Sequence, residues 1–280
     1  MVKQSIDFTK ELFRRFTQHE IPALAAQLSY FLLLSLFPFL VFLITLLGYL
    51  PINQESLFGL IDQFAPPQTL ELIDENLGEL LNNQNTGLLS IGIVGTLWSA
   101  SNGINALIRS FNHAYDVGEN RSFIVARLVA IVLTIAMILV IAIALLLPVF
   151  GKTIGVFLFS FVGLSEGFLR VWNTLRWVIS TIILLIVLTA LYVIAPNNHI
   201  NIKEVLVGAT FATIGWQIVS LAFAYYIDHF SNFSATYGSL GGVIILMIWF
   251  YLSGMIIIIG GELNAMIKEY RKNGTYTPVG

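Results

Sequence analysis

The feature that most constrains the fold is a succession of six apolar segments, each long enough to cross a bilayer, separated by polar connections. We expect spans at about 23–50, 88–112, 126–150, 171–195, 204–226 and 239–267. A helix needs about 20 apolar residues to cross the hydrocarbon core, and in lipid only helices and closed barrels satisfy every backbone hydrogen bond. The sequence therefore predicts an all-α, polytopic six-helix transmembrane bundle, with residues 1–280 as a single integral membrane domain.

Composition supports this class. Hydrophobic residues make up 57% of the chain and charged residues only 11%, against about 25% charged in an ordinary soluble domain. The spans and their connections leave no room for a separate soluble catalytic domain. Because the chain has no cysteine, disulfides, thiolate metal sites and cysteine nucleophiles are excluded. We also expect no metal or other cofactor.

Two segments outside the spans have their own patterns. Residues 1–20 combine basic residues with apolar residues at helical spacing, which predicts an amphipathic helix at the membrane interface. Residues 51–87 are acidic and contain no lysine or arginine. Their apolar spacing predicts two short amphipathic helices broken at Pro66 and Pro67, either capping a vestibule or forming a solvated loop packed on the bundle.

The basic residues predict the orientation. Eleven of the fourteen lysines and arginines lie in the N-terminal segment, the connections near 109–127 and 203, and the C-terminal tail. Because basic residues concentrate in cytoplasmic segments, both termini should be cytoplasmic and the acidic segment 51–87 extracytoplasmic.

Polar residues inside the spans are candidates for a cavity or substrate pathway. They recur at helical spacing on the second and fifth spans and follow a double glycine on the sixth, and comprise Asn102, Asn105, Arg109, Gln217, Asp228, Glu262 and Asn264. An acid in a membrane segment normally faces protein or water and has a partner. We expect Arg109 to pair with Glu262, directly or through a water. The alternatives remain open: the amides can simply hold helices together, and Glu262 can be an interfacial acid at a helix end.

Four motifs carry a family resemblance: SYFLLLSLFPFL (29–40), LWSASNGINALIRSFNHAYD (97–116), YGSLGGVIILMIWFY (237–251) and GGELNA (260–265). The sequence resembles the YihY/BrkB family of bacterial inner-membrane proteins, once labelled ribonuclease BN. The resemblance implies a six-span plasma-membrane protein, and the family is associated with serum resistance and with suggestions of lipid or lipid-linked export. It supplies no catalytic site to transfer.

The residues do not support the ribonuclease label. RNA cleavage needs a metal cluster or an accessible acid–base pair together with a basic surface, whereas His19, His113, His199 and His229 lie on different connections without metal-ligand spacing. Structural or interfacial roles are expected for all four, and we expect neither enzymatic activity nor a nucleic-acid partner. Two functions remain: a transporter or flippase-like protein for a lipid, lipid-linked or amphipathic substrate, and a non-transporting scaffold for envelope partners. Membrane lipids are the expected partners, with a homo-oligomer left open.

Overall fold

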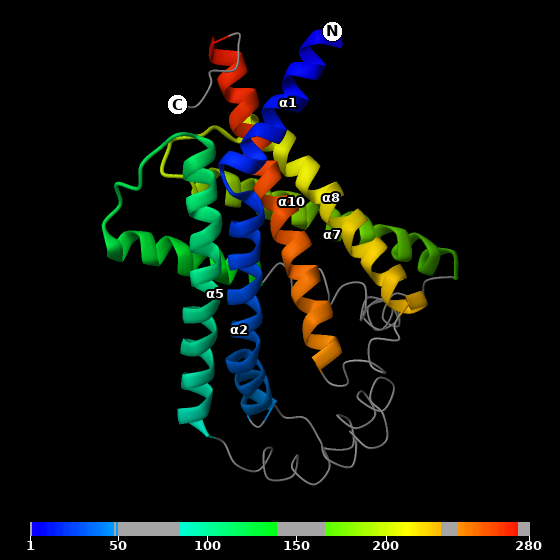
Figure 1. Cartoon of the computed structure of the whole chain (residues 1–280). Coiled ribbons are helices and arrows are strands. Elements are labelled where there is room, and N and C mark those ends of the chain that lie inside the picture. Colours follow the sequence, from blue (N-terminus) through cyan, green and yellow to red (C-terminus); the bar gives the residue numbers. More distant parts are fainter. Residues whose placement is uncertain (1, 48, 50–84, 139–165, 231–239, 274–280) are drawn as a thin grey trace. The chain divides into compact units, whose positions relative to one another are not determined.

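The structure is a computed structural model that describes residues 2–47, 49, 85–138, 166–230 and 240–273 (Figure 1). Within these ranges the secondary structure is helical, with no strand, which confirms the all-α prediction. The labelled helices are α1 (Val2–Gln18), α2 (Ile21–Leu47), α5 (Thr86–Ala114), α7 (Glu166–Ile194), α8 (Ile202–Phe230) and α10 (Leu240–Asn273). A shorter apolar helix covers Phe123–Ile138.

Five of the described helices are long and apolar enough to cross a membrane, namely α2, α5, α7, α8 and α10. They correspond to the first, second, fourth, fifth and sixth expected spans. The expected third span begins in Phe123–Ile138, and its remainder lies outside the described residues. The six-span count therefore stays a prediction, as do the two short helices expected in 51–87, a segment that is described only from residue 85 onward.

Several helices extend past the predicted limits of their apolar segments. α7 begins at Glu166 rather than at about 171, within what we expected to be a connection. α10 continues through the basic residues that follow its apolar run, to Asn273. Hydropathy marks the part of a helix that suits lipid, whereas backbone hydrogen bonding continues into the polar flanks, so the sequence pattern underestimates helix length.

The chain divides into two compact units, and α2 and α5 contribute to both. One unit comprises Met1–Tyr30 and Ser101–Gly280, and the other comprises Phe31–Ala100. In the second unit the two helices run antiparallel: Tyr49 Oη lies 2.7 Å from Thr86 Oγ1, and a Cβ added to Gly95 would lie 3.0 Å from Cβ of Pro38. The helix-interior Pro38 thus marks a place where the two helices pack closely.

In the first unit α8 and α10 cross at small residues. Gly208 and Gly260 bring the two backbones so close that a Cβ added to Gly208 would overlap the Gly260 carbonyl oxygen. At the next position of α10, a Cβ added to Gly261 would meet the ring of Phe111 on α5. Tyr192 on α7 donates to the Ile257 carbonyl of α10 at 2.7 Å. Small residues permit this close approach of membrane helices, and together these contacts pack α10 against α5, α7 and α8.

Helix ends gather at one end of this unit. The Asn197 backbone N–H, after α7, donates to Asn112 near the end of α5 at 2.7 Å. Lys268 near the end of α10 pairs with Glu204 at the start of α8 at 3.1 Å. α5, α7 and α10 therefore run toward this end and α8 away from it, which agrees with alternating spans. Whether this end is cytoplasmic remains the prediction made from the basic residues.

The N-terminal helix turns sharply into α2. The His19 N–H donates to the Arg15 carbonyl at 2.9 Å, and Glu20 has φ of 50°. A left-handed residue commonly ends a helix, and glycine adopts this conformation most easily, so a glutamate there carries a cost of roughly 1 kcal/mol. This turn directs the last two turns of α1 toward α10, against which α1 packs (Figure 1).

A buried charge cluster between α1 and α10

Glu262 is completely buried in α10, with 0% of its surface exposed. Its Oε1 lies 2.5 Å from Nδ1 of His19, which follows α1. Its Oε2 lies 3.6 Å from Nη1 of Arg15, within ion-pair distance, but has no hydrogen-bond partner among the described residues. Glu262 is thus a buried carboxylate that holds the end of α1, and one of its oxygens retains unused hydrogen-bonding capacity.

Arg15 connects three carboxylates. Its Nε donates to Glu11 at 2.7 Å, one turn earlier on α1, its Nη1 donates to the Ala114 carbonyl at 3.2 Å, and its Nη2 pairs with Glu269 on α10. Glu11 also accepts from Arg14 at 2.6 and 2.8 Å. We call the group of Glu11, Arg14, Arg15, His19, Glu262 and Glu269 the Glu262 cluster.

The spacing of α1 explains how its residues enter this cluster. Glu11, Arg15 and His19 are four residues apart, so they lie on one helix face, and all three are buried. Phe13, on another face, is 73% exposed. The predicted N-terminal helix is therefore present, but the face that packs on the protein is polar, which leaves an apolar side chain on the outside. Its location at a membrane interface stays a prediction.

The cluster pairs acids with bases. Three carboxylates, on Glu11, Glu262 and Glu269, lie within ion-pair distance of the guanidinium groups of Arg14 or Arg15. Burial raises the pKa of Glu11, but hydrogen bonds from Arg14 and Arg15 outweigh it, so the pKa lies below the ordinary value of 4.5. Glu11 is therefore an anion at neutral pH.

Further polar groups surround the cluster. The ring of His113 on α5 lies edge-on to that of His19, with centroids 6.4 Å apart. Tyr115 follows α5. Burial raises the pKa of its hydroxyl, and the nearby carboxylates of Glu204 and Glu262 raise it further. Asn264, also fully buried, accepts from the Gly208 backbone N–H at 2.7 Å. Within the described part of the chain, no group of three or more potential ligands could hold a metal ion.

The direct Arg109–Glu262 pair that we expected is wrong. The Arg109 side chain is exposed and donates to Gln27 on α2 at 2.6 Å, whereas the basic partner of Glu262 is Arg15. Arg109 and Glu262 thus both have polar partners, but they do not pair with each other. Both partners, Gln27 and Arg15, lie within the first 27 residues of the chain. The orientation of α5 about its own axis, which the spacing of its polar residues leaves open, accounts for the difference.

The remaining candidates are dispersed. Asn102 accepts from Arg127 at 2.7 Å, Gln217 donates to Thr181 across α7 and α8 at 2.7 Å, and Asn105 is half-buried. The side chain of Asp228 lies outside the described residues. Glu262 and Asn264 are both fully buried on α10 but contact different helices. The six candidates whose side chains are described therefore do not share one set of contacts.

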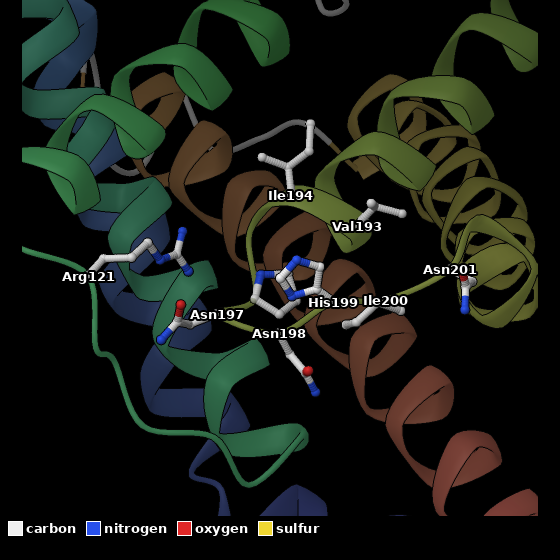
Figure 2. A pocket seen from close by; sticks show the side chains of 9 residues that line it. Arg121, Val193, Ile194, Asn197, Asn198, His199, Ile200 and Asn201 are labelled. Atoms are coloured by element: carbon white, nitrogen blue, oxygen red, sulfur yellow. The ribbon is translucent and has the colours of Figure 1, made fainter.

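A cavity of about 420 Å³ lies elsewhere, at the link between α7 and α8 (Figure 2). In Figure 2, Arg121 lies at one side and Asn201 at the other, with Asn198 and His199 between them in this view. The Arg121 guanidinium is already bonded to Glu119 and to the Ala195 carbonyl. None of the seven predicted residues lines this cavity, so the cavity gives no support to a pathway through them.

Sequence reasoning missed the α1 half of the cluster. His19 was expected to be structural or interfacial, and Arg15 was counted among the basic residues of the amphipathic helix expected over residues 1–20. The available signal was the spacing of four between an acid, a base and a histidine on a helix that precedes the first span. That spacing places the three on one face but does not identify Glu262, the buried acid on α10 that Arg15 and His19 contact.

Comparison with known proteins identifies the family. The Virulence factor BrkB family model matches residues 12–278. YfkH of Bacillus subtilis strain 168, whose name calls it ribonuclease-like, is 56% identical over 267 residues, covering 95% of this chain and 97% of that protein. A UPF0761 membrane protein of Tolumonas auensis is 29% identical, covering 96% of this chain and 87% of that protein. No solved structure matches. The match over nearly the whole length confirms the resemblance seen in the four motifs, and the chain belongs to the Virulence factor BrkB family of membrane proteins.

Proposed function

We propose that this protein is a transporter or flippase-like protein of the bacterial plasma membrane, with both termini cytoplasmic, that moves a lipid, lipid-linked or amphipathic substrate with an anionic head group. The observation that carries the proposal is the exposed guanidinium of Arg109 on the membrane-spanning helix α5, held at 2.6 Å by Gln27 of α2.

The position of Arg109 suits a phosphate-bearing substrate. Arg109 lies five residues before the end of α5 at Ala114, which is about 8 Å along a helix axis. It therefore lies near the level of lipid head groups. A guanidinium has five N–H donors, forms strong charge-assisted hydrogen bonds with phosphate, and is expensive to leave unpaired in a membrane. Gln27 fixes its orientation while leaving donors for such a ligand.

An enzymatic role has less support. The Glu262 cluster contains carboxylates, guanidinium groups and an imidazole but no serine, threonine or cysteine nucleophile. Its acid is fully enclosed, so a large polar substrate such as RNA has no access to it. The ribonuclease-like name belongs to the relative, and we do not extend that activity to this chain.

A second candidate is a non-transporting scaffold, favoured by a specific observation. Gln217 bonds to Thr181 between α7 and α8, and Asn264 bonds to the Gly208 backbone between α10 and α8. These amides therefore hold helices together, as expected for polar residues that stabilise a bundle. A scaffold predicts stable envelope partners that copurify and no substrate movement.

Translocation in proteoliposomes tests the proposal. Purified protein is reconstituted with fluorescent phosphatidylglycerol, and a membrane-impermeant quencher reports the rate at which lipid changes leaflet. We expect a rate above empty liposomes in the wild type and a loss of roughly tenfold in Arg109→Gln, equivalent to about 1.4 kcal/mol of lost binding. The matched control is Arg271→Gln, an exposed arginine in the last turn of α10, which should retain the wild-type rate. Movement that is absent in the wild type, or equally fast in Arg109→Gln, would contradict this role for Arg109.

A further inference from the structure

We propose that the cavity at the link between α7 and α8 binds the phosphate-bearing head group of a membrane phospholipid. This proposal does not depend on the transport function above, because it requires a lipid to be held and not to be moved. Neither Arg109 nor Gln27 is among the described residues that line the cavity. The site is therefore separate from the one assigned to transport.

The cavity lies at the level that lipid head groups occupy. The apolar part of α7 that is suited to cross a membrane ends at Ile194, and that of α8 begins at Ile202. The link between them therefore turns at the membrane surface. The cavity is lined by Val193 and Ile194 from the end of α7 and by residues 196–201 of the link. Its wall thus passes from apolar side chains to polar ones, as a lipid passes from acyl chains to head group.

The link is held in place by contacts with α5 and the segment that follows α5. The Asn197 backbone N–H donates to Asn112 at 2.7 Å, and Nδ2 of Asn197 donates to the Gly118 carbonyl at 2.9 Å. Pro196 and Ile200, on either side of these bonds, are buried. A wall that is formed before the ligand arrives lowers the cost of ordering on binding.

Arg121 supplies directed hydrogen-bond donors. Its Nε donates to Glu119 at 2.9 Å and its Nη2 to the Ala195 carbonyl at 2.7 Å, so the orientation of the guanidinium is fixed. Its Nη1 makes no hydrogen bond with the residues that the structure describes. A guanidinium has five N–H donors and forms strong charge-assisted hydrogen bonds with phosphate. The donors that remain on Arg121 therefore suit phosphate oxygens.

Asn198 and His199 complete the polar lining. Figure 2 shows their side chains between Arg121 and Asn201 in this view. Both are exposed, and within the described part of the chain neither makes a hydrogen bond. An amide and an imidazole each offer a donor to phosphate oxygens and an acceptor to head-group hydroxyls. The cavity volume of about 420 Å³ lies within the range of about 300–1,000 Å³ that is typical of small-ligand sites.

The surroundings favour a lipid over free phosphate. Glu119 pairs with Arg121 at 2.9 Å, so the pair is close to neutral and a small free anion gains little from net charge. A lipid adds contacts between its acyl chains and the apolar side chains beside the link, because Ile194 and Ile202 are 48% and 62% exposed. Basic pockets between membrane helices bind anionic lipid head groups in other proteins.

Photocrosslinking of the full chain in lipid bilayers tests where the lipid lies. Phosphatidylglycerol with a photoreactive group in its head group is mixed into the bilayer at low abundance, and crosslinked peptides are identified by mass spectrometry. We expect the link 195–201 to be labelled. Photoreactive diacylglycerol, which has no phosphate, should label this link much less. Labelling that spares the link, or equal labelling by the two lipids, would overturn the site.

A competition arm separates the two sources of phosphate. Inorganic phosphate added in millimolar excess should leave the labelling of the link unchanged, because it lacks the acyl chains that hold the lipid beside Ile194 and Ile202. If inorganic phosphate abolishes the labelling, the site belongs to free phosphate and the lipid assignment is wrong.

Asn198→Asp tests the chemistry of the cavity. The substitution replaces an amide donor with a carboxylate of similar size, which repels phosphate. Folding should be retained, because Asn198 makes no hydrogen bond with the described residues. We expect labelling of the link to fall by about tenfold, which corresponds to the loss of one hydrogen bond to a charged group. The matched control is Lys272→Gln, which changes the net charge equally at an exposed position in the last turn of α10 and should label like the wild type. Equal labelling of Asn198→Asp and Lys272→Gln would refute the assignment.

Discussion

Gly208→Ala should destabilise the protein by separating α8 from α10. The added Cβ would overlap the Gly260 carbonyl oxygen and lie 2.5 Å from Nδ2 and 2.6 Å from Cγ of Asn264. Ordinary carbon contacts are about 3.5–4.0 Å, so the two helices must move apart by on the order of 1 Å. One of the obstructing atoms belongs to the backbone, which cannot rotate away as a side chain can.

The expected magnitude follows from three terms. Overpacking costs about 1–3 kcal/mol. Separation also strains or breaks the buried bond from the Gly208 N–H to Asn264, now 2.7 Å long, and leaving such groups unsatisfied costs about 1–3 kcal/mol. Alanine returns about 1 kcal/mol through its higher helix propensity. The net loss is about 2 kcal/mol or more, which corresponds to a fall in Tm of roughly 4–8 °C for a chain of this size.

The assay is thermal unfolding of the purified protein in one detergent at one scan rate. Gly242→Ala is the matched control, because Gly242 lies in α10 and a Cβ added there meets nothing within 4 Å. This control should unfold at the wild-type temperature or slightly above it, by the same propensity gain of about 1 kcal/mol. If Gly208→Ala unfolds no earlier than Gly242→Ala, the helices are not in the close contact described and the reasoning is refuted.

Three further predictions concern polar contacts within α1 and between helices. Guanidinium hydrogen bonds depress the pKa of Glu11 below 4.5, so its stabilising effect is present above about pH 4.5 and is lost as pH falls through the depressed value. The Tm of the wild type should therefore fall more in acid than the Tm of Glu11→Gln, and an identical acid response in the two proteins would contradict this. Gln217→Leu removes the bond to Thr181 and should lower the free energy of unfolding by less than about 1 kcal/mol; reversible unfolding in SDS measures this loss, and a larger one would indicate a role beyond helix packing. Tyr192→Phe removes a buried bond to the α10 backbone and should lower Tm by about 2–4 °C, for a loss of about 1 kcal/mol, whereas an unchanged Tm would show that this bond contributes nothing net.

Much of the fold could be predicted because a membrane helix is specified locally. About 20 consecutive apolar residues suffice to identify one, and five of the expected spans coincide with described helices. The candidate site was predicted only in part. Glu262 was singled out because an acid in such a segment is costly, and it is indeed fully buried. Its partners could not be predicted, because Arg15 and His19 lie in a polar helix whose charges also suit a membrane surface.

By itself, the sequence determined the class of protein: helical, membrane-embedded, a member of the Virulence factor BrkB family, and with a buried acid near the end of its last span. These properties depend on residue type and local spacing. Hydropathy and helical periodicity measure both directly from the sequence. Only the tertiary structure decided that Glu262 meets His19 and Arg15 while Arg109 meets Gln27. That choice depends on how each helix is rotated about its axis and on which helices approach closely at Gly208, Gly260 and Gly261, and no local pattern specifies either.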